Sequence, residues 1–354
     1  MPVSSHYSFF GLHLECAFPE DVADKWDLMY GRLRASPDGE PYLRLAIREE
    51  SADQYALGIN DVVHHIPQEH VMVRLQDIVQ NYVLPAVRTH VLWHAALWSV
   101  EGRGLMILGA SGLGKTTLSL AHHLAGGLVL SDEIAACHPE TALMIAFPRA
   151  LAVRPDSLIV LDDSRAHPRV TLDEEKAIVP LPDEALRMAI PLSVVCVLER
   201  PADAAAEPSG SVFEMQVRAS NDAWCDTLRS CWPEAQLMPH PDGEDWWRVR
   251  YTDSLRLRAL EEALRQSGAV LAGFHRGARR KPSFAGPPII EEMDSGAAAE
   301  MVLAEMVNGR TWDDRVGALR LMAMVRTALR PARCVRCVPG RLKETLAGIL
   351  QWAD

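Results

Sequence analysis

One glycine-rich segment constrains the fold of this chain more than any other feature. The segment Gly109-Ala-Ser-Gly-Leu-Gly-Lys-Thr116 matches the pattern G-x-x-x-x-G-K-[ST] without a gap. A short apolar run at 105–108 predicts a strand before it, and helical spacing over 115–124 predicts a helix after it. In this setting the glycines let backbone N–H groups surround phosphate oxygens, and the helix N-terminus adds partial positive charge. We therefore predict a P-loop that binds a nucleoside triphosphate.

The motif also predicts roles for individual side chains. Lys115 is expected to reach the β- and γ-phosphates, and the Thr116 hydroxyl is expected to ligate Mg²⁺. ATP and Mg²⁺ are thus the expected ligands, although the sequence does not distinguish ATP from GTP. The residues expected to bind the nucleotide are Gly109, Ala110, Ser111, Gly112, Leu113, Gly114, Lys115, Thr116, Thr117 and Arg149.

An acidic pair, Asp132 and Glu133, follows the next buried strand, which we predict at 128–130. Strand, loop, helix and strand together predict a βαβ unit with a parallel pair of strands. Acidic residues at the carboxyl end of such a strand lie beside the mouth of the P-loop. One carboxylate can hold Mg²⁺ and the other can take a proton from an attacking hydroxyl. A helix cap or a solvated loop is the alternative interpretation.

Two further side chains are weaker candidates. His94 lies on a strand predicted at 91–100, which leads into the loop; alone it is more typical of a core or surface histidine, and its spacing from His90 does not predict a metal site. Arg149 or Arg154 could clamp a phosphate through paired N–H donors, or could be a surface arginine on a strand. Lys176 is a weaker candidate of the same kind.

Composition sets the broad class of the protein. The 354 residues suffice for two ordinary domains or for one large domain with an insertion. A net charge of −11 argues against non-specific nucleic-acid binding, and no apolar run is long enough to predict a membrane span. The first residues do not have the pattern of a signal peptide, and the seven scattered cysteines fit a reducing cytoplasm. Cys334 and Cys337 are expected to serve packing.

The chain divides into three parts by pattern. Residues 1–90 form an N-terminal α/β region, 91–200 and 281–354 form the core around the P-loop, and 201–280 is an insertion. The insertion follows a linker-like stretch at 201–210 and has the order β-α-β-β-α-β, the ferredoxin-like pattern of an α+β domain. Its strands are predicted at 212–217, 236–238, 246–251 and 270–274, and its helices at 222–232 and 255–266. Other predicted elements are strands at 42–47, 192–198 and 333–338 and helical segments at 71–83, 296–328 and 342–352.

The stretch from His94 to Thr116, together with Ser131-Asp132-Glu133, resembles the core of HPr kinase/phosphorylase. It resembles even more the HPr-kinase-related bacterial kinases, some of which accompany peptide-modification clusters. In that family a histidine stands at this distance before the P-loop, and an acidic pair follows the next strand. The segment 147–149, the strand 192–198 and the ending 332–350 are also similar. The resemblance covers roughly 91–200 and 282–350.

The resemblance implies the α/β fold of phosphoenolpyruvate carboxykinases, a P-loop core distinct from the common NTPase fold. It also implies transfer of the γ-phosphoryl group to a serine-type hydroxyl of a peptide, small protein or small molecule. By position, Lys115 would bind phosphates, Thr116 and Asp132 would serve Mg²⁺, Glu133 would be the base and His94 would lie near the acidic pair. HPr kinases proper usually have Asp where Glu133 stands, and no glycine-rich signature follows the pair here. The resemblance therefore does not extend to HPr as the substrate or to a reverse phosphorylase activity.

Two other functions compete with this one. The chain could be a nucleotide-binding regulatory protein with little or no phosphotransfer, whose insertion binds a partner. A decarboxylating carboxykinase would need further metal and substrate ligands, which the sequence does not identify. We expect no nucleic acid and no membrane as partners, and the sequence leaves a homo-oligomer open.

Overall fold

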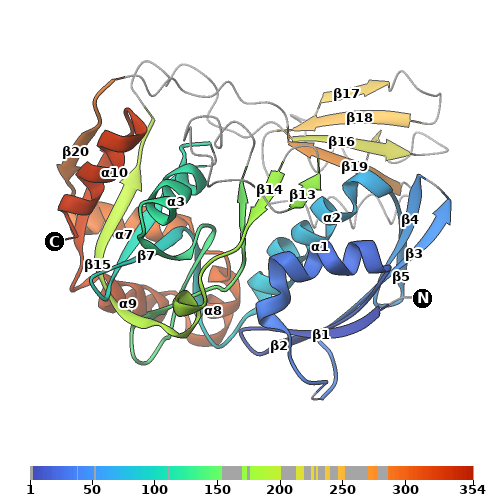
Figure 1. Cartoon of the computed structure of the whole chain (residues 1–354), viewed down its shortest axis with the longest axis horizontal. Helices are drawn as coiled ribbons and strands as arrows, with labels where there is room; N and C mark the ends of the chain where they lie inside the picture. Colours follow the sequence, from blue (N-terminus) through green and yellow to red (C-terminus); the bar gives the residue numbers. More distant parts are fainter. Residues whose placement is uncertain are drawn as a thin grey trace.

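Four β-sheets organise the part of the chain that the structure describes (Figure 1). This computed structural model describes residues 3–37, 39–51, 53–110, 112–153, 170–173, 176–200, 213–218, 225–226, 229, 236–239, 246–251, 270–276 and 286–353. Within these ranges, no helix is both long and apolar enough to cross a membrane. The N-terminal elements lie on one side of the molecule and the C-terminal helices on the other (Figure 1).

The N-terminal region is a five-stranded sheet covered by two helices. Its strands lie in the order β1-β2-β3-β4-β5, and only β2 and β3 of this sheet are parallel, since α1 connects them. Alternate residues of β2, namely Leu14, Cys16 and Phe18, are buried, so one face of the sheet supplies the core. The helix predicted at 71–83 is α2 continued by a π-helical turn. The bounds are β1 Val3–Phe9, β2 Leu12–Phe18, α1 Glu20–Tyr30, β3 Leu43–Ser51, β4 Gln54–Ile59, β5 Val62–Pro67, α2 Val71–Ile78 and the π-helical turn Val79–Val83.

The central sheet carries the P-loop. Its order is β6-β10-β11-β15-β8-β7-β9, with β21 beside β15 and β20 beside β21. Strands β8, β15 and β21 are mutually parallel, and the predicted strand 192–198 lies at the centre within β15. The bounds are β6 Val91–His94, β7 Ala96–Val100, β8 Arg103–Leu108, β9 Leu128–Ser131, β10 Ile134–Cys137, β11 Leu143–Ile145, β15 Ala189–Leu198, β20 Ile289–Glu292 and β21 Arg333–Val338.

Helices cover both faces of this sheet. Along β8, Met106 packs with the helices α7, α8 and α9, whereas the next residue, Ile107, packs with α3 and α10. This alternation follows from the pleat of a strand, which sends successive side chains to opposite faces. The helical prediction at 296–328 and the helices predicted at 115–124 and 342–352 are confirmed. The bounds are α3 Lys115–Leu124, α7 Ser295–Ala304, α8 Gly309–Val316, α9 Ala318–Leu329 and α10 Leu342–Gln351.

Two expectations about the segment before the P-loop are wrong. The predicted strand 91–100 is interrupted at Ala95: β6 pairs with β10, whereas β7 pairs with β8 and β9. As a result β8 and β9 are not neighbours, because β7 lies between them and is antiparallel to both. The cause is the tight turn at Glu101 and Gly102, which both have positive φ, 51° and 77°. That turn folds β7 back onto β8 as a hairpin and leaves β15 as the parallel neighbour of β8.

The four strands predicted in the insertion are present and form a separate antiparallel sheet. They lie in the order β17-β18-β16-β19, and β19 lies near β5 of the N-terminal sheet (Figure 1). Of the helix predicted at 222–232, residues 225–226 and 229 are described and are helical. The linker at 201–210 and the helix at 255–266 lie outside the described residues. The bounds are β16 Phe213–Arg218, β17 Gln236–Pro239, β18 Trp246–Tyr251 and β19 Val270–Arg276.

A small third sheet begins after β11, and its strand β12 packs against α3. It joins β12, β14 and β13 in that order, all antiparallel. Its bounds are β12 Leu151–Val153, β13 Val170–Asp173 and β14 Lys176–Val179. Lys176 is at the start of β14, and Arg154 lies outside the described residues.

A buried asparagine ties the N-terminal region to the core. Asn308 accepts a hydrogen bond from the backbone N–H of Leu92 at 3.0 Å. Its amide group donates to the carbonyl oxygens of Val87 and His90, at 2.9 and 2.7 Å. Three bonds from one buried side chain fix the chain where it passes from the N-terminal region into β6.

Candidate nucleotide-binding and phosphoryl-transfer site

The predicted P-loop joins the end of β8 to α3, as the motif requires. Gly109 has φ of 146°, and a Cβ placed on it would lie 2.8 Å from Cβ of Leu198. Gly114 has φ of 95° and forms the N-cap of α3 in the left-handed conformation. Both positions therefore need glycine, one for close approach to β15 and one for the backbone turn. Ser111 lies outside the described residues.

The first turn of α3 suits a phosphate group. No side chain caps this helix, because its N-cap residue is Gly114. The backbone N–H groups of the first turn have no partner within the helix, and the helix dipole favours an anion there. The Lys115 ammonium group is buried and donates a hydrogen bond to the carbonyl oxygen of Gly109, so it lies across the loop. These residues fit the phosphates of a nucleotide.

The acidic pair lies beside the P-loop helix. The Thr116 hydroxyl donates a hydrogen bond of 3.2 Å to Oδ2 of Asp132. Ser131 turns the chain at this point, because its Oγ accepts from the backbone N–H groups of Glu133 and Ile134 at 3.2 and 3.0 Å. Burial raises the pKa of Asp132, while Arg149 opposes the rise and Glu133 adds to it. The two oxygens of Thr116 and Asp132 are the hard ligands that Mg²⁺ prefers, so this pair fits the ion.

Arg149 is a buried residue between β11 and β12, and the interpretation of it as a surface arginine on a strand is wrong. Its guanidinium group lies 3.3 Å from Oδ1 of Asp132 and forms an ion pair with Glu133. Burial disfavours the charged form of Arg149 and so lowers the pKa of its guanidinium group. The charges of Glu133 and Asp132 together have a larger, opposite effect, so the pKa is raised. The structure thus brings Arg149 to the site, with its donors directed at the acidic pair.

Two residues of the N-terminal region lie near the acidic pair, and sequence reasoning missed both. Gln80, in the π-helical turn, donates a hydrogen bond from Nε2 to the Glu133 carboxylate. Tyr30, the last residue of α1, is buried, and burial raises the pKa of its hydroxyl to about 12, while the charge of Arg149 opposes the rise. Neither residue lies in a recognisable motif, and both come from parts of the chain far from Asp132 and Glu133 in sequence, so no local pattern could have found them.

His94 and Glu305 lie around the same site. The register of β6 and β10 places His94 opposite Ile134, the residue after Glu133. The backbone N–H of His94 donates to the carbonyl oxygen of Glu305 at 2.8 Å. Burial raises the pKa of the Glu305 carboxyl, and the charge of Lys115 opposes this, so the two side chains are in electrostatic reach. Glu305 had no sequence signal, because it follows a helix with no motif of its own.

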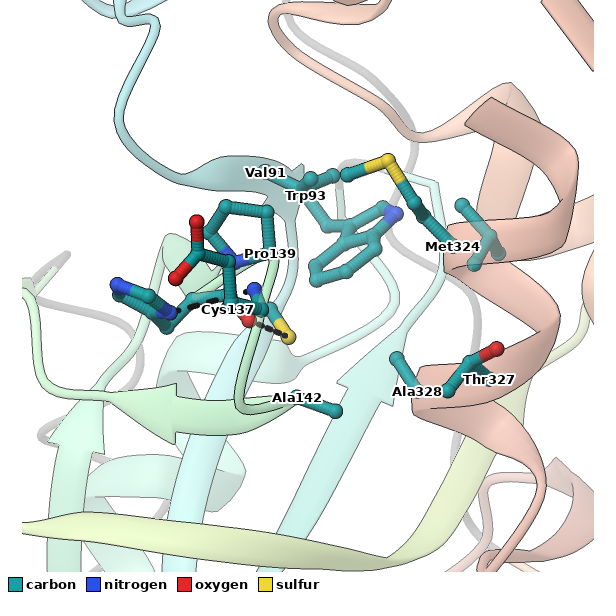
Figure 2. Close-up of a pocket in the computed structure, with 11 residues that line it drawn as sticks. Val91, Trp93, Cys137, Pro139, Ala142, Met324, Thr327 and Ala328 are labelled. Carbon is teal, nitrogen blue, oxygen red and sulfur yellow. Dashed lines mark hydrogen bonds between the residues drawn. The ribbon is translucent and has the colours of Figure 1, made fainter. Parts of the chain in front are cut away.

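A small cavity at the other end of the β6–β10 pair is not this site (Figure 2). Val91 and Cys137, which face each other across that end of the pair, line it together with Trp93 and with Met324 of α9. Its volume is about 30 Å³, which suits one water molecule, whereas a nucleotide needs several hundred Å³. The cavity is therefore too small to hold a nucleotide.

Comparisons with known proteins do not assign a family to the chain. No protein-family model matches it. No curated protein sequence matches it either. Among solved structures, it is similar to the Hpr(Ser) kinase/phosphatase from Coxiella burnetii, with a TM-score of 0.22 and 15% sequence identity over 49% of this chain and 94% of that chain. A likeness of this size carries no argument about fold or function, so the arguments below come from the residues of the site.

Proposed function

We propose that this protein is an ATP- and Mg²⁺-dependent kinase that transfers the γ-phosphoryl group to a serine-type hydroxyl. The acceptor would be a peptide, a small protein or a small molecule. The observation that carries this proposal is the 3.2 Å hydrogen bond between the Thr116 hydroxyl and Asp132. It joins the P-loop helix to an acidic pair, and a phosphotransferase needs both a phosphate cradle and carboxylates at that place.

The P-loop residues bind and orient the nucleotide in this proposal. Backbone N–H groups at the start of α3 hold the β-phosphate, and Lys115 turns from the Gly109 carbonyl towards the transferred group. Thr116 and Asp132 hold Mg²⁺, which supplies charge neutralisation on the phosphates. In the proposal, the remaining predicted residues have a backbone role in binding the nucleotide. These residues are Ala110, Gly112, Leu113 and Thr117.

Glu133 is the proposed general base. It accepts the proton of the acceptor hydroxyl as that oxygen bonds to the γ-phosphorus, while the bond from that phosphorus to the β–γ bridging oxygen breaks and the nucleoside diphosphate leaves. Arg149 compensates the charge of both carboxylates in a buried place and keeps them in a fixed arrangement. His94 lies on β6 opposite Ile134, the residue after Glu133, and is the remaining candidate for this group.

We further propose the domain organisation and family that go with this activity. Residues 91–200 and 281–354 form a core of the HPr-kinase and phosphoenolpyruvate-carboxykinase type, and residues 1–90 form an N-terminal region. Residues 201–280 form an inserted ferredoxin-like domain, which the strand order β17-β18-β16-β19 supports. The described cysteines are free thiols, which supports a cytoplasmic location.

Label transfer from γ-labelled ATP tests the proposal. Purified protein with Mg²⁺ and a panel of peptides, small proteins and hydroxyl compounds is compared with its Lys115→Ala and Glu133→Gln variants. Transfer that is lost in both variants and kept in Lys343→Ala, an exposed lysine of α10, supports the kinase. Nucleotide binding without transfer to any acceptor would instead favour the regulatory protein.

A further inference from the structure

The segment that carries Arg149 is built into the N-terminal region. The Phe147 ring stacks on Phe10 with centroids 5.7 Å apart. Phe147 belongs to the hydrophobic core that β1, β2 and α1 share, and Phe10 packs against that core. The backbone N–H of Ala150 donates to the carbonyl oxygen of Met29, near the end of α1, at 3.1 Å. The position of Arg149 is therefore set by packing against residues 1–90, not by the central sheet alone.

Gln80 reaches the acidic pair from an unusual backbone element. It lies in the π-helical turn Val79–Val83, which continues α2 without a break. Such turns are rare overall, but they are frequent at functional sites. Here the Gln80 amide donates a hydrogen bond to the Glu133 carboxylate.

Arg149 is the other partner of Glu133, with which it forms an ion pair. The next residue, Ala150, is hydrogen-bonded to Met29 of α1 through its backbone. The Glu133 carboxylate is thus contacted by two groups, Gln80 and Arg149, that the N-terminal region holds in place.

We infer that Gln80 is a positioning residue for Glu133 and that residues 1–90 are part of the phosphoryl-transfer unit. The inference rests on the proposed function for its catalytic meaning. Gln80 holds the carboxylate directly. A base displaced by about 1 Å loses about a hundredfold in rate, so this contact controls turnover without touching the nucleotide.

The first experiment compares Gln80→Met with Gln68→Met in the full-length chain. Methionine keeps the length of the side chain but cannot donate a hydrogen bond. Gln68 is a matched control, because its amide donates to the Tyr55 hydroxyl at 3.1 Å and not to the acidic pair. We expect Gln80→Met to lower kcat by about tenfold or more, with KM for ATP unchanged. Gln80→Glu, which sets a negative charge against Glu133, should lower kcat further.

Equal kcat values for Gln80→Met, Gln80→Glu and the unchanged protein would overturn the inference. The proposed kinase function would still stand, because the unchanged protein transfers phosphate. A fall that Gln68→Met shares would also overturn it, because the effect would then be general destabilisation.

A second measurement does not depend on activity. Melting temperatures are compared for the unchanged protein, Gln80→Met, Glu133→Met and the double variant. The inferred contact predicts that Gln80→Met shifts the melting temperature less when Glu133 is already replaced. Additive shifts would overturn the inference even if no acceptor is found, whereas absence of transfer by the unchanged protein would count against the proposed function alone.

Discussion

The guanidinium group of Arg149 lies 3.3 Å from Oδ1 of Asp132, and the two side chains are only 5% and 3% exposed. A charge pair this deeply buried is held in place by its partners. Removal of one partner leaves an uncompensated charge in a medium that solvates it poorly. Arg149, which also pairs with Glu133, therefore balances the whole acidic pair.

Arg149→Met should therefore destabilise the protein strongly. We expect a loss of about 3–5 kcal/mol in the free energy of unfolding, because two buried carboxylates lose their counter-charge. Urea denaturation followed by circular dichroism measures it. Arg32→Met is the control: its ion pair with Asp183 has side-chain exposures of 30% and 89%, and such pairs contribute about 1 kcal/mol or less. A loss no larger than that of the control would contradict the role given to Arg149.

Thr116→Val tests the link between the P-loop helix and the acidic pair. Valine keeps the shape of threonine but has no hydroxyl to bond Asp132 or ligate Mg²⁺. We expect the gain in nucleotide affinity on adding Mg²⁺ to fall by about tenfold, or about 1.4 kcal/mol, while affinity without Mg²⁺ stays the same. Titration of a fluorescent ATP analogue with and without Mg²⁺ measures both. Thr327→Val, whose hydroxyl bonds within α9, should leave both affinities unchanged.

The elements around the P-loop could be predicted from sequence because their signals are local. Residues 109–116 carry a motif, and the helix at 115–124 and the strand at 333–338 match the predicted bounds. The interruption at Ala95 could not be predicted in this way. Residues 91–100 are apolar except for His94 and Ser99, and such a run does not show where a strand changes its neighbours.

The sequence singles out Thr116 and Arg149, but the contact that the N-terminal region makes with the acidic pair could not be predicted. Gln80 reaches Glu133 only because the N-terminal region packs against the segment at 147–150. Its position depends on tertiary packing of residues distant in sequence, which a pattern in one chain does not encode locally. The same holds for Glu305, which follows α7 and is distant in sequence from the P-loop. Its carboxyl interacts electrostatically with Lys115.

His122 predicts a dependence of stability on pH. The His122 ring stacks on Trp98 of β7, where α3 packs against the central sheet. Burial lowers the pKa of His122 from 6.5 to about 4, and the charge of His123 adds to the effect. Between those values the unfolded chain binds a proton that the folded protein does not. Stability should therefore fall as pH decreases from 6.5 towards 4 and be fully present above 6.5.

Phenylalanine at position 122 should remove this part of the pH dependence while keeping the stacking on Trp98. Melting temperatures of His122→Phe and of the unchanged protein, measured from pH 7 down to pH 4, check it, and their difference should change across that window. His65→Gln, a substitution of a largely exposed histidine on β5, serves as the control. Parallel melting curves for His122→Phe and the unchanged protein would show that His122 is protonated equally in the folded and unfolded states.

Gly109→Ala separates close packing from backbone conformation in the P-loop. A Cβ at Gly109 would lie 2.8 Å from Cβ and 3.0 Å from the carbonyl oxygen of Leu198, both on β15. Gly102 also has positive φ, 77°, but a Cβ there would meet nothing within 4 Å. We expect Gly102→Ala to lower the free energy of unfolding by about 1–2 kcal/mol, the ordinary penalty for a non-glycine residue in the left-handed conformation. Gly109→Ala should lower it more, because the backbone of β15 must also move. The displaced loop should lose ATP binding in Gly109→Ala but not in Gly102→Ala, and equal affinities in calorimetric titration would contradict this account of the P-loop.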